Sequence, residues 1–195
     1  MTLVPEDTTP LDPEELAGLK LSYISNRAEL NAAEAVNLEA GLRWAGTPRS
    51  LQELLEAGFV CELHRRMFGD VWKWAGAYRK TDKNIGIPWW QVETQIAELL
   101  LDAVAWTGGA SLAWPVDEIG ARFHHRLVSI HPFPNGNGRH SRAAADPLLV
   151  ALGAEPFTWG QENLANPGAV RSRYVTALRA ADEHDFDLLL KFVRT

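Results

Sequence analysis

Residues 130–142 read IHPFPNGNGRHSR and concentrate one kind of chemistry in a short stretch of chain. Gly136 and Gly138 allow the backbone to adopt positive φ and to bring its N–H groups close to a ligand. A helix that begins near Gly138 adds free N–H groups and the positive end of its dipole, and together these groups form an anion site suited to phosphate. The stretch therefore predicts a phosphate-binding loop that leads into a helix.

The polar side chains of this loop suit phosphate chemistry. Arg139 and Arg142 are three residues apart and share one face of the expected helix, and their planar guanidinium groups fit a polyphosphate. His131 titrates near neutral pH and can take a proton from a hydroxyl group that attacks phosphorus. Phe133, the one large apolar side chain here, holds the loop in shape if buried. On composition alone such a loop is usually a surface turn, but the order of histidine, glycines and arginines favours a functional site.

Other cofactor sites find no support in the sequence. His124, His125, His131 and His140 lack cysteine or carboxylate partners at the spacing of zinc ligands. Neither the phosphate-loop pattern GxxxxGK[ST] nor the dinucleotide pattern GxGxxG occurs.

The composition narrows the class of protein. With 195 residues, 46% of them hydrophobic, the chain is long enough for one domain with an appended segment. Its net charge of −6 argues against nonspecific nucleic-acid binding. Cys61 is the single cysteine, which excludes an internal disulfide and fits a reducing compartment. The N-terminus lacks the apolar core of a signal peptide, and no apolar run approaches the ~20 residues that span a bilayer. We therefore expect a cytoplasmic protein with neither a nucleic-acid nor a membrane partner.

Apolar periodicity and capping residues predict a largely helical chain. Residues 1–13 hold three prolines and are expected to form a poorly ordered arm, with helical pattern from Pro13 onward. Ser50 resembles the N-cap of a helix that Gly58 weakens, and Pro147 is expected to break or kink another. We predict helices at residues 28–45, 51–67, 92–108, 115–130, from 138 onward, and in one or two pieces over 167–193.

Residues 81–87 predict the one departure from helix. Ile85 and Ile87 alternate with small residues, and residues 81–84 have turn chemistry, which together favour a short β-hairpin. Trp72 and Trp74 are expected to anchor this hairpin to the body of the protein.

At this point three segments indicate a family. Residues 123–142, FHHRLVSIHPFPNGNGRHSR, resemble the motif HPFx[D/E]GNGRxxR of the Fic (Fido) family. Residues 68–86 resemble the region that leads through that family's flap hairpin, and residues 177–193 resemble its C-terminal helices. Residues 9–31 make the chain similar to the Fic subgroup called mobile mystery protein B. The resemblance implies a mainly α-helical Fic-fold bundle with a small β-hairpin flap, organised as an N-terminal arm and inhibitory helix at 1–48 and a Fic domain at 49–195.

The resemblance also implies an activity: ATP-dependent transfer of AMP onto a Tyr, Thr or Ser hydroxyl of a target protein. His131 would be the general base and Phe133 the anchor of the loop. The α- and β-phosphates would lie against the backbone of 136–138 with help from Arg139, and Arg142 would take the γ-phosphate. The corresponding residues are Gly136, Asn137 and Gly138. The flap would hold the target segment in extended form; its residues are Thr81, Asp82, Lys83, Asn84, Ile85, Gly86 and Ile87.

Two positions depart from the family pattern. Asn135 stands where the family has an Asp or Glu that binds Mg²⁺, and a neutral amide oxygen is a weaker ligand than a carboxylate, so the affinity for Mg²⁺ should fall. The family's inhibitory helix has the pattern [S/T]xxxE[G/N], which Ser25 and Glu29 match while Leu30 does not. The resemblance implies that Glu29 pairs with Arg142 and misplaces the γ-phosphate, whereas the simpler interpretation is a solvated glutamate on an amphipathic helix.

Two rival functions stay open at this stage. One is a catalytically weak or silent Fic-fold module in a toxin–antitoxin-like pair, acting with a small regulatory partner protein. The reason to retain this alternative is Asn135, which replaces the family's metal-binding Asp or Glu. The other is transfer of another phosphate-containing group, as in the death-on-curing branch, whose motif has a lysine at the position of Gly138.

Overall fold

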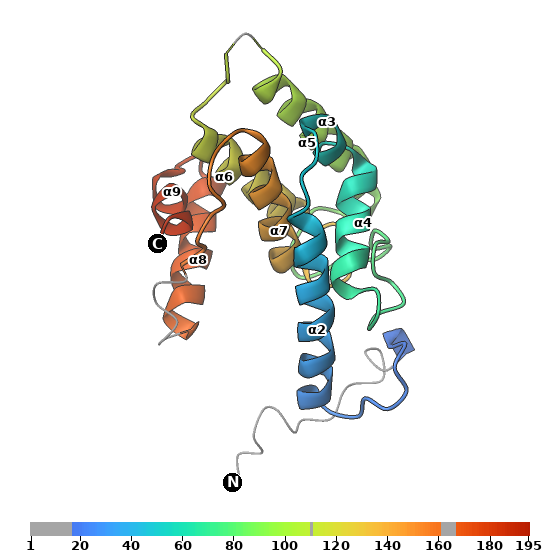
Figure 1. Ribbon diagram of the computed structural model, residues 1–195. Coiled ribbons are helices and arrows are strands. Elements are labelled where there is room, and N and C mark those ends of the chain that lie inside the picture. The colour runs from blue at the N-terminus through green and yellow to red at the C-terminus, as the bar shows by residue number, and fades with distance from the viewer. Residues whose placement is uncertain (1–16, 110, 161–166) are drawn as a thin grey trace.

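The computed structural model describes residues 17–109, 111–160 and 167–195, and it is a helical bundle (Figure 1). The expected arm at residues 1–13 lies outside these ranges. The bounds of the helices follow the apolar periodicity closely. The elements are α2 (Arg27–Ala45), α3 (Leu51–Leu54), α4 (Ala57–Phe68), the 3-10 turn η2 (Trp89–Gln91), α5 (Val92–Thr107), α6 (Val116–Ile130), α7 (Asn137–Ala151), α8 (Pro167–Asp182) and α9 (Asp187–Val193).

The predicted helix at 51–67 is two helices. Ser50 forms the expected capping box, because its hydroxyl accepts from the Glu53 N–H and the Glu53 carboxylate accepts from the Ser50 N–H. α3 ends at Leu54, and α4 begins after Glu56, whose backbone is extended (φ −102, ψ 142). This bend directs both Leu54 and Leu55 into the core. The interruption therefore lies ahead of Gly58 and not at it.

Pro147 does not end its helix. α7 continues through it to Ala151, and Leu148 and Leu149 directly after it are fully buried. Burial of these two leucines outweighs the loss of one backbone hydrogen bond to the proline.

The predicted β-hairpin at residues 81–87 is wrong. Within the described ranges the β pairing is limited to one isolated bridge between Leu19 and Trp72. The carbonyls of Thr81 and Ile87, which strand pairing would need, accept hydrogen bonds from the Arg79 guanidinium instead. The segment is a loop tied at both ends to one side chain, and we call residues 81–87 the flap.

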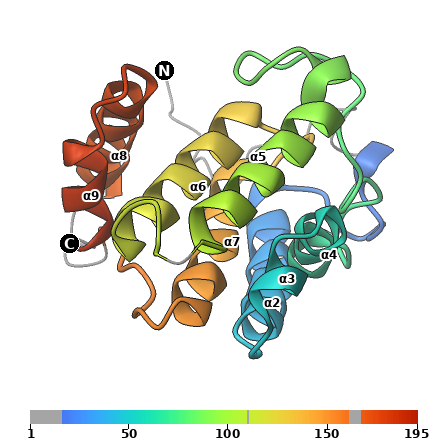
Figure 2. The ribbon, with the colours of Figure 1, turned by 90° about the horizontal axis from the view of Figure 1, so that it is seen from above.

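The helices surround a central pair. α6 and α7 pack side by side, with α5 against α6, while α2, α3 and α4 lie on one flank and α8 and α9 on the other (Figure 2). The loop that joins α6 to α7 carries the sequence motif. Its Phe133 is among the largest fully buried side chains, together with Phe68 and Phe123. The motif loop is thus fixed from inside the bundle.

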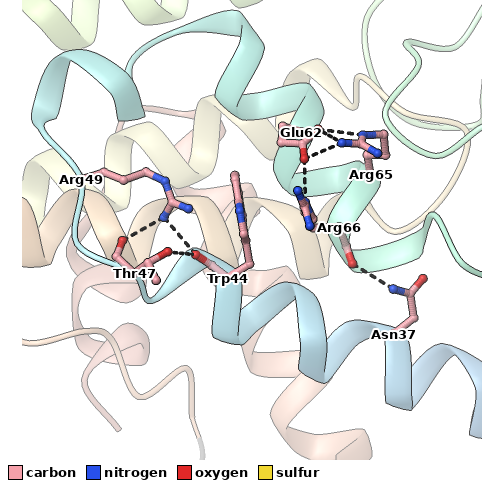
Figure 3. Close-up of polar contacts among 7 residues, drawn as sticks. All are labelled: Asn37, Trp44, Thr47, Arg49, Glu62, Arg65 and Arg66. Atoms are coloured by element: carbon pink, nitrogen blue, oxygen red, sulfur yellow. Dashed lines mark hydrogen bonds and ion pairs between the residues drawn. The ribbon is translucent and has the colours of Figure 1, made fainter.

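α2 is fastened to α4 by polar contacts as well as by packing (Figure 3). Asn37, buried on α2, donates to the carbonyl of Arg66 over 2.9 Å and accepts from the Asp70 N–H over 2.9 Å. Past the end of α2, Arg49 donates to the Trp44 carbonyl over 2.9 Å and lies 4.0 Å from the centre of its ring. The bonds of Asn37 fix the register of α2 against α4, and the bond of Arg49 closes the C-terminal end of α2. Among the described helices, none is long and apolar enough to cross a membrane.

Candidate active site

His131 ends α6 in a left-handed conformation (φ 55, ψ 58), which is uncommon for a residue other than glycine. Arg79 holds this geometry, because its Nε donates to the His131 carbonyl over 2.7 Å and its backbone N–H donates to the Pro132 carbonyl over 2.9 Å. Burial lowers the pKa of the imidazole, the backbone of Val128 opposes that shift, and the charges of Arg79 and Lys83 add to it. The ring is therefore neutral at pH 7, as a proton acceptor must be.

Phe133 and Asn137 lock the loop to itself. Phe133 is fully buried, as predicted for an anchor. The Asn137 side chain accepts from the Phe133 N–H and donates to the Phe133 carbonyl, each over 2.8 Å, and is itself buried. The side chain of Asn137 thus shapes the loop, and only its backbone N–H is left to face a phosphate.

The glycines have different roles. Gly136 is the N-cap of α7 with φ 77, and a Cβ there would lie 2.5 Å from the ring of Phe68. A Cβ at Gly138 would meet no atom within 4 Å. The loop is therefore packed tightly behind Gly136 and open in front of Gly138, where the N-terminus of α7 presents its N–H groups.

Asn135 is exposed, and its Oδ1 accepts from the Gly136 N–H over 2.7 Å. Its one amide oxygen is neutral and already engaged, so it matches poorly the carboxylate ligands that Mg²⁺ prefers. Over the described residues, no group of three or more His, Cys, Asp or Glu could hold a metal ion. Asn135 therefore presents a weaker metal ligand than the carboxylate of the family motif.

The two motif arginines point to different partners. Arg139 Nη1 pairs with Glu34 Oε2 over 2.7 Å, and its guanidinium lies 4.7 Å from the centre of the Phe68 ring. Arg142 Nε donates to the Gly138 carbonyl over 3.2 Å, and its guanidinium lies 5.8 Å from the centre of the Tyr174 ring. Both arginines project from the first two turns of α7, Arg139 toward α2 and Arg142 toward Tyr174 of α8.

The expected pair between Glu29 and Arg142 does not form in this structure. Asn26 is the N-cap of α2, and Glu29 turns back to accept from the N–H of Ser25 over 2.7 Å and from its hydroxyl over 3.1 Å. These bonds lower the pKa of Glu29, and its carboxylate is fully exposed. The SxxxE pattern here caps the first turn of a helix.

Glu34, one and a half turns further along α2, makes the contact with the site that the sequence did not single out. Its second oxygen accepts from the indole N–H of Trp72 over 2.7 Å. Trp72 stacks on Trp74, with ring centres 5.0 Å apart, so the predicted hairpin anchor Trp72 instead holds α2 through Glu34. No local pattern marks Glu34, because its partner Arg139 is 105 residues away.

His64 of α4 is a second residue that the sequence did not reveal. It is fully buried, its Nδ1 accepts from the Gly76 N–H over 2.9 Å, and its Nε2 lies 3.1 Å from the Asn135 carbonyl. Its ring stacks on Phe133 with 3.7 Å between centres. Burial lowers its pKa to about 2, so the ring is neutral.

Arg79 is the third, and it joins the flap to the loop. Besides the carbonyls of Thr81 and Ile87, its buried guanidinium reaches the carbonyls of Ile130 and His131. Gly86 lies so close that a Cβ there would be 2.6 Å from the Cβ of His131. The flap therefore runs past the histidine at backbone contact.

This geometry accompanies a match to a known family. Residues 54–149 match the Fic/DOC family model. A protein adenylyltransferase Fic of Drosophila sechellia is 32% identical over 139 residues, which are 69% of this chain and 26% of that protein. Fic-1 (residues 134–508) of C. elegans is similar in structure, with a TM-score of 0.62 and 25% identity over 83% of this chain and 46% of that one. BepC of Bartonella tribocorum, solved with bound AMPPNP, shares the fold at a TM-score of 0.70 and 17% identity, over 96% of this chain and 91% of that one.

The chain spans only about a quarter to a third of the length of the curated relatives that it matches (31% and 26% of two of them). The residues that match the family model include the loop around His131. The family model, the curated relatives and the structural neighbours agree, and this chain belongs to the Fic/DOC family.

Proposed function

We propose that this protein transfers AMP from ATP onto a hydroxyl side chain of a target protein. The observation that carries the proposal is the neutral His131, held in a left-handed conformation directly before the open N-terminus of α7. The backbone of 136–138 and the guanidinium groups of Arg139 and Arg142 supply the positive side of a triphosphate site. The names of its relatives, protein adenylyltransferases, agree with this chemistry.

The reaction is a substitution at the α-phosphorus. The target hydroxyl oxygen forms a bond to this phosphorus, the bond from phosphorus to the β-phosphate oxygen breaks, and pyrophosphate leaves. Nδ1 of His131 is buried, so Nε2 is the nitrogen that takes the hydroxyl proton. N–H groups and arginines that face the phosphates stabilise the charge that builds up on their oxygens.

Mg²⁺ enters this proposal only through the nucleotide. A bound Mg²⁺ would supply charge neutralisation to the phosphates, which would themselves provide most of its ligands because Asn135 offers one neutral oxygen. Asn135 thus weakens metal binding without removing the phosphate-binding backbone.

The flap supports a protein as the acceptor. The backbone at Gly86 lies against His131, and the exposed Ile85 and the half-buried Ile87 flank it. A target segment laid along residues 81–87 would bring its Tyr, Thr or Ser hydroxyl to the imidazole. A small regulatory partner protein, membership of the mobile mystery protein B subgroup and a cytoplasmic location stay predictions of the sequence.

Self-inhibition by the N-terminal helix also stays a prediction, but its expected contact is absent, since Glu29 is bonded to Ser25. A closed form that pairs Glu29 with Arg142 would require the Glu29 carboxylate to leave Ser25.

The test is incubation of the protein with ATP labelled at the α-phosphate and a cell lysate. We expect labelled protein with the wild type and none with His131→Ala, while both bind ATP. His184→Asn is the matched control, because His184 is exposed on the turn between α8 and α9 and asparagine tolerates its left-handed backbone. ATP binding without transfer by the wild type would instead support the silent partner module.

A further inference from the structure

The Asn135–Gly136 peptide connects the packed back of the motif loop to its open front. A trans peptide directs its C=O and its N–H to opposite sides, and no cis peptide occurs in the described part of the chain. The Asn135 carbonyl faces the ring of His64, 3.1 Å from Nε2. The Gly136 N–H therefore points away from His64.

The two ring nitrogens of His64 have fixed roles. Nδ1 accepts the N–H of Gly76 over 2.9 Å, so the ring proton is on Nε2, which donates to the Asn135 carbonyl. A buried neutral ring with both nitrogens engaged has no freedom to flip. The hydrogen bond fixes the orientation of the Asn135–Gly136 peptide.

Aromatic packing removes the remaining freedom of the loop. His64 stacks on Phe133 at 3.7 Å and 16° and lies 4.8 Å from Phe68, measured between ring centres. Phe68 in turn fills the space behind Gly136. The Asn135–Gly136 peptide cannot rotate without displacing the buried rings of His64 and Phe68.

In this structure the outward Gly136 N–H donates to Oδ1 of Asn135 over 2.7 Å. Asn135 is exposed, so a phosphate oxygen can replace its amide oxygen at little cost. A hydrogen bond to an anionic acceptor is about twice as strong as one to a neutral acceptor, which favours the exchange.

We propose that His64 is a positioning residue for phosphate binding: by holding the Asn135 carbonyl, it aims the Gly136 N–H at the triphosphate of the nucleotide. Asn135 occupies that donor until a phosphate oxygen takes its place. This inference rests on the proposed nucleotide site and adds to it a residue 71 positions away in sequence.

Two amide substitutions separate the two hydrogen bonds of His64. In His64→Asn the amide oxygen occupies the place of Nδ1 and still accepts from Gly76, but no donor reaches Asn135. In His64→Gln the longer side chain brings an N–H to the place of Nε2 and restores that donor. The binding of ATP, pyrophosphate and adenosine to each variant is measured by isothermal titration calorimetry, and folding is checked by thermal denaturation.

We expect His64→Asn to bind ATP and pyrophosphate about tenfold more weakly, the loss expected when one hydrogen bond to an anion is misaligned. Its affinity for adenosine should not change, and His64→Gln should recover most of the phosphate affinity. Equal weakening for adenosine and pyrophosphate, or equal effects of the two variants, would overturn the positioning role. A wild type that binds no ATP would overturn the proposed function itself.

A measurement on the wild type covers the case in which the variants do not fold. On titration with pyrophosphate, the ¹⁵N–¹H resonance of Gly136 should shift downfield as its hydrogen bond passes from Asn135 to phosphate. A Gly136 resonance that stays in place while Arg139 and Gly138 respond would contradict the proposal.

Discussion

His131 shows how one residue obtains its chemistry from its surroundings. The pKa of its ring is lowered from its ordinary value of 6.5 mainly by burial, so the neutral form that accepts a proton persists below pH 6.5. We predict that kcat/KM for transfer is level between pH 7 and 8 and falls on an acid limb with an apparent pKa below 6.5. An acid limb at or above that value, measured where circular dichroism shows intact folding, would assign the titration to another group.

Glu29 yields a prediction opposite to the one that its sequence pattern favours. Its carboxylate bonds to Ser25 and is fully exposed, so it takes no guanidinium group from the phosphates. Glu29→Gly should therefore leave the rate of transfer unchanged in an assay where His131→Ala abolishes it. A strong gain of activity would show that α2 adopts a second arrangement in solution, with Glu29 at Arg142.

Residues of the loop were predictable, and those that hold it were not. The order of His131, Phe133 and the two glycines is local, so the sequence alone predicted the buried anchor Phe133 and a positive φ in the glycine segment, which occurs at Gly136 and not at Gly138. The role of His131 as the base stays a prediction. The loop's buried supports come from far away: Arg79 meets the His131 carbonyl across 52 residues. Such contacts arise only when helices pack, and no spacing rule reports them.

At the scale of elements, the flap depends on one buried side chain. Arg79 donates to carbonyls at both ends of the flap and at the end of α6. Lysine keeps the charge but lacks the planar fork, so it leaves several of these carbonyls without a donor, at about 1–3 kcal/mol each where they are buried. We predict that Arg79→Lys unfolds at lower temperature and exchanges the amide hydrogens of residues 81–87 faster. Lys80→Arg is the control, because Lys80 is exposed directly before the same segment.

The close approach of the flap to the histidine can be tested at Gly86. Its φ of 101° is a conformation that L side chains rarely adopt, and a Cβ would lie 2.6 Å from the Cβ of His131. We predict that Gly86→Ala displaces the flap. The fold decrease in the rate of transfer should be at least as large as the fold increase in KM for the target. Gly58→Ala is a suitable control, since a Cβ there meets no atom within 4 Å. A wild-type rate of transfer by Gly86→Ala would mean that the flap shifts to accommodate the added methyl group without affecting catalysis.

α2 is connected to the site through Glu34. Its carboxylate joins Trp72 to Arg139, and 13% of the Glu34 side chain is exposed, so its loss leaves an indole N–H and a guanidinium without their partner. We predict that Glu34→Ala lowers the free energy of unfolding by about 1–3 kcal/mol in urea denaturation. Glu39→Ala is the matched control on the same helix, because Glu39 pairs with Arg43 only at the surface (3.9 Å). Equal stability of the two variants would mean that Glu34 contributes no more than a surface charge.

For the whole molecule, buried histidines set the response to acid. Burial lowers the pKa of His64 to about 2, of His124 to about 3 and of His140 to about 4. The unfolded chain binds a proton at each near pH 6.5 while the folded chain does not, so stability is present above that pH and is lost below it, at about 1.4 kcal/mol per pH unit for each ring.

Asp146 opposes this loss, because burial raises its pKa to about 6 and the folded chain therefore gains a proton there first. The sum is a loss of about 3 kcal/mol per pH unit, which for a domain of ordinary stability predicts an unfolding midpoint between about pH 3 and 5. Far-UV circular dichroism across a pH titration measures it. A chain still folded well below pH 3 would mean that these rings accept protons without unfolding.

The sequence predicted the fold correctly where helical periodicity was strong. The prediction failed at the flap, where hydrogen bonds from one side chain replace the backbone bonds of a strand pair. α5 and α6 bury apolar faces as their periodicity predicts, and their bounds agree with the predicted ranges to within a residue or two. The bounds of α2 agree as well, but its buried residues are Leu30, Asn37, Gly41 and Ala45, and most of the face predicted from its alanines is exposed. The flap has alternating residues and turn chemistry, but its carbonyls at Thr81 and Ile87 accept hydrogen bonds from Arg79 instead of from a second strand. Bonds from a single guanidinium group produce no periodic pattern in the sequence.

The support of the motif loop by His64 limits whether this loop could function after transfer into another protein. Residues 130–142 look like a portable cassette, since they contain the base, the glycines and both arginines. Inserted between two helices of an unrelated bundle, the cassette would lack the His64 ring behind Asn135, and the orientation of the Gly136 N–H would no longer be fixed. The smallest unit that an engineer could transplant therefore includes α4 as well as the loop, and it is discontinuous in the chain.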